Sequence, residues 1–303
     1  MKTLETLLVS IDDSDPSVGA VDLALRLAKT LAARLTFCST VDITLVAEEC
    51  SSPYVVPDIA GIFETLDAEC TRVLADAKAK AAAAGIDAKT LALSGRPADA
   101  ILDTARTDGY DAVVVGTHGR HGLARAFIGS VAEEVIRHSD RPVFVAAPKT
   151  PEDFRRIGIA IENSDSCRAA IEFALDVSAA AGAALVLLHV ADNRESSHPT
   201  MSAAVQSLIH ETSETAKARG IAVEAAIRIG EPVQRILEML RSENIDLLAM
   251  GTHGRWGLPR TFLGSTAEGV VRDSPVPVVV ERGVAAEARQ PKLPVLALQQ
   301  TSP

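Results

Sequence analysis

Short apolar runs alternate with longer amphipathic stretches along the first half of the chain. Leu7–Ile11 is a short, largely apolar run followed by a polar break, which is typical of a strand buried on both faces. Asp15 and Pro16 then predict a helix start, with Asp15 as the N-cap and Pro16 at the first helical position. Apolar residues follow at helical spacing at Val18, Val21, Leu25, Ala28 and Leu31. The pattern predicts a strand followed by a helix.

The same alternation continues to about residue 146. Further strands are expected at Leu35–Thr40, Ala88–Leu93, Ala112–Val115 and Pro142–Ala146. Helices are expected in an Ala-rich stretch ending near Gly85, around Ala98–Arg106 and at Val131–His138. Alternating strands and helices favour a parallel sheet with helices on both faces. In such sheets, ligands bind beyond the carboxyl ends of the strands.

The second half of the chain repeats the first. Eleven residues of the fifteen-residue segment Gly116–Ser130 (GTHGRHGLARAFIGS) recur in Gly251–Ser265 (GTHGRWGLPRTFLGS). Leu7–Ser17 likewise matches Ile157–Cys167, but at an offset of about 150 rather than 135. The first half therefore holds about fifteen extra residues, which we place within Thr44–Phe63 as a lid, an interface patch or a plain surface loop.

This duplication predicts an α/β protein of two tandem doubly wound domains, each a five-stranded parallel sheet with helices on both faces. Each half has the length of an ordinary domain. We place the first domain at residues 1–150 and the second at residues 151–283. Residues 284–303 are expected to form a loosely held tail.

The repeated segment carries the candidate chemistry. Gly116 and Gly119 leave a predicted strand, where backbone without Cβ atoms can approach a ligand closely. Gly129 and Ser130 open a helix whose free N–H groups and positive dipole end favour phosphate. Arg120, Arg125 and His118 lie in the connecting loop, where guanidinium groups can pair with phosphate oxygens. The equivalent residues of the second half are Gly251, His253, Gly254, Arg255, Arg260, Gly264 and Ser265. The structural alternative is that the glycines only make a tight turn and close helix packing.

Composition excludes several classes of function. The formal net charge of −10 argues against a general nucleic-acid binder, which would present a basic face. The four cysteines form no C-x-x-C pair, so reduced thiols in a cytoplasmic protein are expected rather than a zinc site. No apolar stretch is long enough for a membrane span, and the N-terminus does not resemble a signal peptide.

Both halves resemble universal stress protein domains, over nearly all of residues 4–282. The spacing of glycine, two residues, glycine, nine residues and Gly-Ser is met twice. In the nucleotide-binding branch of that family, this signature holds the phosphates and ribose of ATP. The resemblance also implies that Asp12 contacts the adenosine portion and Val41 the adenine, and that Val115 and Val131 line the site. Ile11, which precedes Asp12, belongs to the same candidate set.

The second half departs from that pattern. Glu162 stands in place of Asp12, preceded by Ile161, and Val190, Met250 and Thr266 are aligned with Val41, Val115 and Val131. The residues expected to hold the phosphates are thus kept in the second half. Whether its longer carboxylate still fits the adenosine portion is left open. Asp12 also has a simpler interpretation, as an Asx-turn residue after a strand.

Other polar residues fit structural roles better. His189 lies in an apolar strand and is expected to be a core histidine, and His138 suits the negative end of a helix dipole. Glu133 and Glu134 are expected on a solvated helix face rather than at a metal.

The sequence therefore favours a cytoplasmic ATP-binding stress-response protein with two nucleotide sites and at most slow hydrolysis. Mg²⁺ or Mn²⁺ bound with ATP is left open, and no catalytic residue or protein-bound metal is expected. The resemblance also implies intramolecular pairing of the two domains, with a homodimer left open. The alternatives are a nucleotide-free interaction protein and, ranked lower, an adenylating enzyme, since the SGGxDS sequence typical of that activity is absent.

Overall fold

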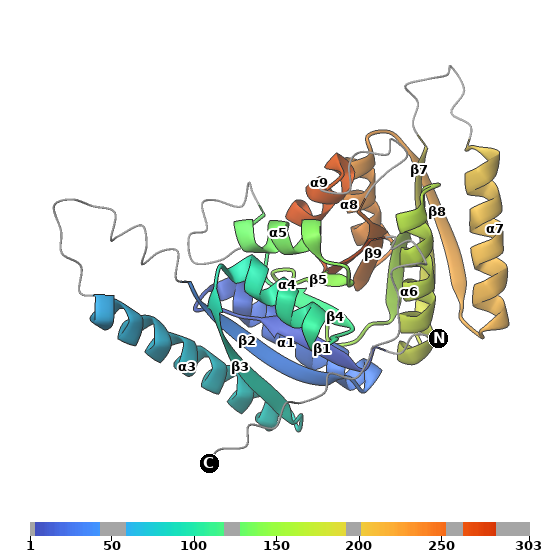
Figure 1. Cartoon of the computed structure of the whole chain (residues 1–303). Coiled ribbons are helices and arrows are strands. Elements are labelled where there is room, and N and C mark those ends of the chain that lie inside the picture. The colour runs from blue at the N-terminus through green and yellow to red at the C-terminus, as the bar shows by residue number, and fades with distance from the viewer. Residues whose placement is uncertain (1–3, 43–58, 118–127, 192–200, 253–262, 283–303) are drawn as a thin grey trace, which may run out of the picture.

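The computed structural model describes residues 4–42, 59–117, 128–191, 201–252 and 263–282. These residues form eight helices and ten strands, in two halves with the same order of elements (Figure 1). No described helix is both long enough and apolar enough to cross a bilayer.

The first half alternates strands and helices as its hydrophobic pattern predicts. Its strands are β1 (Thr6–Ser10), β2 (Arg34–Asp42), β3 (Ala88–Gly95), β4 (Ala112–Val115) and β5 (Val143–Val145). Its helices are α1 (Asp15–Leu31), α3 (Ile59–Ala83), α4 (Pro97–Thr107) and α5 (Ser130–His138).

The second half repeats this order. Its strands are β6 (Arg156–Ala160), β7 (Ala184–Ala191), β8 (Val223–Ile229), β9 (Leu247–Gly251) and β10 (Val278–Glu281). Its helices are α6 (Asp165–Ala181), α7 (Ala203–Ala218), α8 (Pro232–Ser242) and α9 (Ser265–Asp273).

The two expected five-stranded parallel sheets are confirmed, and they join into one sheet of ten strands. The strand order is β3-β2-β1-β4-β5-β10-β9-β6-β7-β8. All neighbours are parallel except β5 and β10, which pair antiparallel at the centre. Helices α3 and α7 lie near the two ends of this sheet (Figure 1). The sequence did not predict this joining of the sheets.

The antiparallel pairing of β5 with β10 makes the strands of the two halves run in opposite directions. Each half is internally parallel, so the carboxyl ends of β1–β5 and those of β6–β10 lie at opposite edges of the sheet. Because ligands of such sheets bind at the carboxyl edge, the two candidate sites must lie on opposite edges of the molecule.

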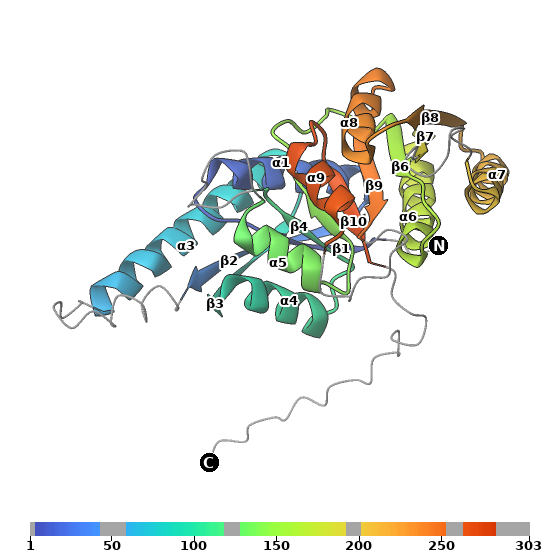
Figure 2. The same ribbon diagram turned by 90° about the horizontal axis from the view of Figure 1, so that it is seen from above.

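Each face of the sheet carries a separate apolar core, which confirms helices on both faces. One core joins the sheet to α1, α3, α6 and α7, and the other joins it to α4, α5, α8 and α9. Figure 2 shows α1 and α4 on opposite sides of the strands of the first half. Since successive strand residues face opposite sides, β4 contributes Val114 to the first core and Val115 to the second.

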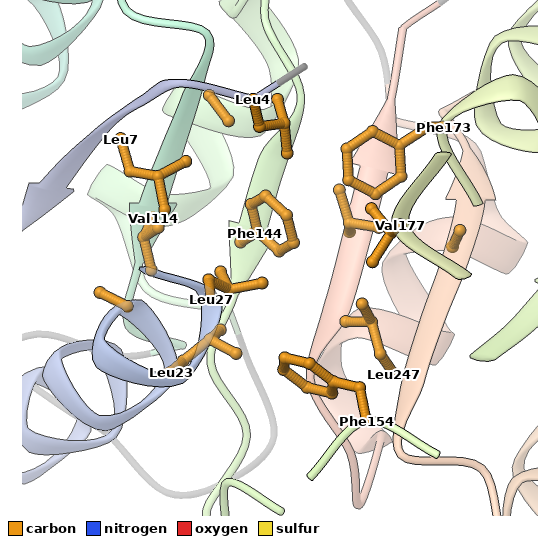
Figure 3. Close-up of a cluster of buried hydrophobic side chains, with 14 of the residues drawn as sticks. Leu4, Leu7, Leu23, Leu27, Val114, Phe144, Phe154, Phe173, Val177 and Leu247 are labelled. Carbon is orange, nitrogen blue, oxygen red and sulfur yellow. The ribbon is translucent and has the colours of Figure 1, made fainter. Parts of the chain in front are cut away.

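Large apolar side chains from both halves meet at the centre of the first core (Figure 3). Phe144 of β5 lies opposite Val279 of β10 in the strand register, and both are fully buried. The Phe144 ring packs edge-on against Phe173 of α6, with ring centroids 5.6 Å apart and an interplanar angle of 66°. Edge-to-face pairs of this kind add stabilisation beyond their buried area. The two halves thus share one core.

Two details differ from the sequence prediction. Helix α1 begins at Asp15 with Ser14 as its N-cap, so the prediction of Asp15 as the cap is wrong by one residue. Helix α3 has 25 residues and α7 has 16, so nine of the extra residues of the first half lengthen a helix. The predicted insertion therefore reaches into α3 from residue 59 onward, while residues 43–58 lie outside the described part of the chain.

Replacing Phe144 by alanine should weaken the attachment of the two halves. Phe144→Ala removes a fully buried ring from the shared core, and such truncations cost about 3–5 kcal/mol of unfolding free energy. Urea unfolding followed by circular dichroism would measure this loss. The control is Val18→Ala, whose side chain is 54% exposed and should change stability by less than about 0.5 kcal/mol. A loss below about 1 kcal/mol for Phe144→Ala would contradict the shared core.

Candidate functional site

The candidate residues gather where the strand order reverses. From β1 the chain proceeds outward to β2 and β3, then returns to place β4 on the other side of β1. The carboxyl ends of β1 and β4 therefore flank a topological switch point, the usual ligand position in such sheets. Asp12 follows β1 and Gly116 follows β4. We call this place site one, and the equivalent place beyond β6 and β9, with Glu162 and Gly251, site two.

In site one, two serines hold the Asp12 carboxylate. Its Oδ1 accepts hydrogen bonds from the hydroxyls of Ser14 and Ser17, and from the backbone N–H of Ser14 at 3.1 Å. The last of these is the Asx turn expected from the sequence. Ser17 also accepts a bond from the backbone N–H of Asp12 at 2.9 Å. Among the described residues, all hydrogen bonds to this half-buried carboxylate fall on Oδ1, which leaves Oδ2 available to a ligand.

Site two keeps one of these serines and replaces the other by cysteine. The Ser164 hydroxyl donates to Glu162 Oε1 at 2.9 Å and caps α6 by accepting from the backbone N–H of Cys167 at 3.2 Å. The Cys167 thiol accepts from the backbone N–H of Glu162 at 3.3 Å and donates to the Ala160 carbonyl at 3.5 Å. Its proton is therefore directed to the backbone and not to the Glu162 carboxylate.

Each site includes a helix start built from Gly-Ser. Gly129 is the N-cap of α5 and Gly264 is the N-cap of α9, with nearly identical backbone angles and no side-chain cap at either. The Gly129 N–H donates to the Thr117 carbonyl at 2.7 Å, and the Gly264 N–H donates to the Thr252 carbonyl at 2.9 Å. These bonds tie each helix start to the segment leaving β4 or β9.

The first turns of these helices can hold an anion. Their initial N–H groups have no partner within the helix, and the positive end of the dipole lies there. Ser130 and Ser265 are exposed at these starts, while Val131 and Thr266 are half-buried beside them. At the ends of β4 and β9, Val115 and Met250 are buried in the second core, and Ile11 and Ile161 are buried in the first core beneath the carboxylates.

Gly251 has a packing role that does not depend on any ligand. A Cβ at this position would lie 2.5 Å from Ser166 Oγ and 2.9 Å from the backbone nitrogen of Cys167. The start of α6 therefore approaches the end of β9 too closely for any residue but glycine. Close packing therefore requires glycine at position 251, and it brings the start of α6 next to the end of β9.

The strand register corrects one alignment between the halves. Ser10 pairs with Cys38 and Ala160 pairs with Leu188, so the offset of 150 persists through the second strand of each half. Val41 therefore corresponds to Ala191, and the alignment of Val190 with Val41 is wrong by one residue. Such a shift reverses the face of the sheet: Val41 packs on the first core, whereas Val190 packs on the second.

Part of the predicted signature lies outside the described residues. This applies to His118, Gly119, Arg120, Arg125, His253, Gly254, Arg255 and Arg260.

Several other polar residues have structural roles. His189 is buried, and its Nδ1 lies 2.9 Å from the carbonyl oxygen of Ile161, which confirms a core histidine. Glu133 forms an ion pair with Arg137, and Glu134 forms one with Arg96 at 2.8 Å. Within the described ranges, no group of three or more His, Cys, Asp or Glu residues is placed to hold a metal.

Two cysteines are buried thiols with raised pKa values. Burial raises the pKa of Cys38 to about 12 and that of Cys167 to about 11. Both therefore remain protonated at neutral pH, and Cys167 keeps the proton that it donates to Ala160. A thiol that stays protonated is a poor nucleophile.

The family assignment follows from the whole of both halves. The model of the universal stress protein family matches residues 3–147 and again residues 153–282. The chain belongs to the universal stress protein family. The two matches show that it carries two tandem domains of that family, as the internal repeat predicts.

Known relatives agree with this assignment. The chain is 36% identical over 142 residues to universal stress protein YxiE of Bacillus subtilis, a match that covers 46% of the chain and 96% of the relative. It is 29% identical over 187 residues to universal stress protein Rv1996 of Mycobacterium tuberculosis, covering 56% of the chain and 58% of the relative. A universal stress protein structure from Archaeoglobus fulgidus superposes with a TM-score of 0.74 at 24% identity, over 94% of this chain and all of the other, and shows the shared fold.

Adding one methyl group at Gly251 should destabilise the protein in the absence of any ligand. Gly251→Ala would force the first turn of α6 away from β9, and overpacking of this kind costs about 1–3 kcal/mol. Urea unfolding of the ligand-free protein measures the loss. Ser265→Ala is the control, because that side chain is exposed, so its effect should stay within about 0.5 kcal/mol. Equal stabilities would contradict the packing role.

Proposed function

We propose that the protein binds ATP at both sites as part of a stress response. The observation that carries this proposal is the repeated arrangement of a carboxylate and an uncapped helix start around a switch point. The helix start suits the phosphates. The carboxylate suits the hydroxyl groups of the ribose, because an ionised carboxylate accepts strong hydrogen bonds.

The two ends of the nucleotide would then be held by different elements. Gly129 and Ser130 would hold the phosphates of site one, together with Gly119 and Arg120. Asp12 would hold the adenosine portion, with Val41 beside the adenine. In site two the equivalent groups are Glu162, Gly264, Ser265 and, by register, Ala191. Mg²⁺ or Mn²⁺ would reach the site bound to ATP.

We further propose that the protein acts in the cytoplasm and that it binds ATP rather than turning it over rapidly. Buried thiols at Cys38 and Cys167 suit a reducing compartment. The serine hydroxyls that contact the Asp12 and Glu162 carboxylates lie at the starts of α1 and α6, where they hold the carboxylates in place.

Nucleotide binding can be tested by disabling the sites one at a time. Calorimetric titration with ATP and Mg²⁺ should find two sites in the unmodified protein and one in either Gly119→Val or Gly254→Val. A valine side chain would block the close approach of the phosphates. Losing two or three charge-assisted hydrogen bonds, about 3 kcal/mol, corresponds to at least hundredfold weaker binding at the altered site.

The double variant decides between the proposal and its rivals. Unchanged ATP affinity in Gly119→Val/Gly254→Val would contradict the assigned sites. No binding in the unmodified protein would favour a nucleotide-free interaction protein.

Hydrolysis should be slow even when both sites are filled. Phosphate release with ATP and either Mg²⁺ or Mn²⁺ is expected far below the ~1–1000 per second of typical enzymes. The matched control is the double glycine variant, which shows the background of contaminating phosphatases. If the unmodified protein hydrolyses ATP at rates in the enzyme range and the double variant does not, the binding-protein interpretation is wrong and an enzymatic function is favoured.

A further inference from the structure

The two sites differ in how their carboxylates are held. Ser17 and Cys167 occupy the same place, five residues after Asp12 and Glu162 and in the first turn of α1 and α6. Both are buried, with exposed fractions of 7% and 0%. Both also accept a bond from the backbone N–H of their carboxylate residue. The two side chains therefore sit alike and differ in what the hydroxyl or thiol proton does.

The Ser17 proton goes to the carboxylate and the Cys167 proton goes to the backbone. Ser17 donates to Asp12 Oδ1, together with Ser14. Cys167 instead donates to the Ala160 carbonyl. Two hydroxyl donors on one oxygen fix the rotation of the short Asp12 side chain, and Oδ2 keeps its lone pairs for a ligand. A thiol is a weaker donor than a hydroxyl, and Cys167 gives the longer Glu162 side chain no bond from this position.

We propose that Ser17 is a positioning residue of site one, which presets the Asp12 carboxylate for an adenine nucleotide, and that Cys167 does not supply the equivalent bond to Glu162 in site two. This proposal rests on the proposed function and extends it. Preorganised groups bind more tightly because they lose less freedom on binding. Site one should therefore bind ATP more tightly than site two, for a reason that adds to the difference between aspartate and glutamate.

A double-mutant cycle in a one-site background tests the proposal. The parent is Gly254→Val, which retains site one, and ATP is the probe. Ser17→Ala should weaken ATP binding about tenfold, which corresponds to about 1.4 kcal/mol. Ser17→Cys should behave like Ser17→Ala, since it introduces the side chain of site two.

The Asp12 background separates positioning from a general structural effect. If Ser17 acts through Asp12, then Ser17→Ala should not weaken binding further in an Asp12→Ala protein. Equal weakening in both backgrounds, or unchanged affinity in the Gly254→Val parent, would overturn the proposal. Urea unfolding of every variant identifies any loss of affinity that comes from loss of fold.

The reciprocal change in site two supplies a gain of function. In the Gly119→Val background, Glu162→Asp combined with Cys167→Ser should tighten ATP binding more than Glu162→Asp alone. If the added Cys167→Ser change gives no gain, the claim about site two is wrong.

A readout without ligand keeps this proposal separate from the proposed function. In crystals of the ligand-free Ser17→Ala protein, the Asp12 carboxylate should leave the single orientation that it holds with Ser17 present. An unchanged orientation would overturn the positioning role even if ATP binds. A changed orientation in a protein that binds no ATP would instead leave the positioning role standing and refute the proposed function.

Discussion

The antiparallel pairing of β5 with β10 is the constraint on which the rest of the structure depends. It converts two parallel five-stranded sheets into one continuous sheet and points their carboxyl edges in opposite directions. Backbone pairing alone would not select this partner, since any exposed strand edge offers the same bonds. The buried contact of Phe144 with Phe173, opposite Val279, adds side-chain packing that only the two different halves provide together.

The repeat made most of the fold predictable from sequence, because buried parallel strands and amphipathic helices leave strong hydrophobic patterns. The strand Ala112–Val115 was predicted with its true limits. The central joining was not predictable, since the apolar run around Phe144 looks the same whether the strand is an edge or is paired. The alignment of Val190 failed because a short apolar strand hides its register, whereas backbone pairing shows that Ala191 is the equivalent residue.

The candidate site was predictable only in part. Glycine spacing and a carboxylate after a strand are sequence signals, and the described residues among them lie together around the switch points. The roles of Ser14 and Ser17 were missed, although both serines are visible in the sequence, two and five residues after Asp12. In the second half only the first of the two is kept, as Ser164. The signal was ambiguous because serines at a helix start usually act as caps. Here Ser14 and Ser17 donate to Asp12, while Ser164 both caps α6 and donates to Glu162.

The two candidate sites lie at opposite edges of the sheet, so a change in one of them does not alter the other. Candidate site one takes its residues from β1, α1, β2, β4 and α5, and candidate site two from β6, α6, β7, β9 and α9. No described element therefore serves both. The second half has Cys167 where the first half has Ser17. This difference changes one site without altering β5 or β10, the strands that join the halves. The shared core holds the two domains together while each carboxyl edge is free to diverge. The chain thus carries its own matched comparison, in which Asp12 with Ser17 and Glu162 with Cys167 differ on the same framework.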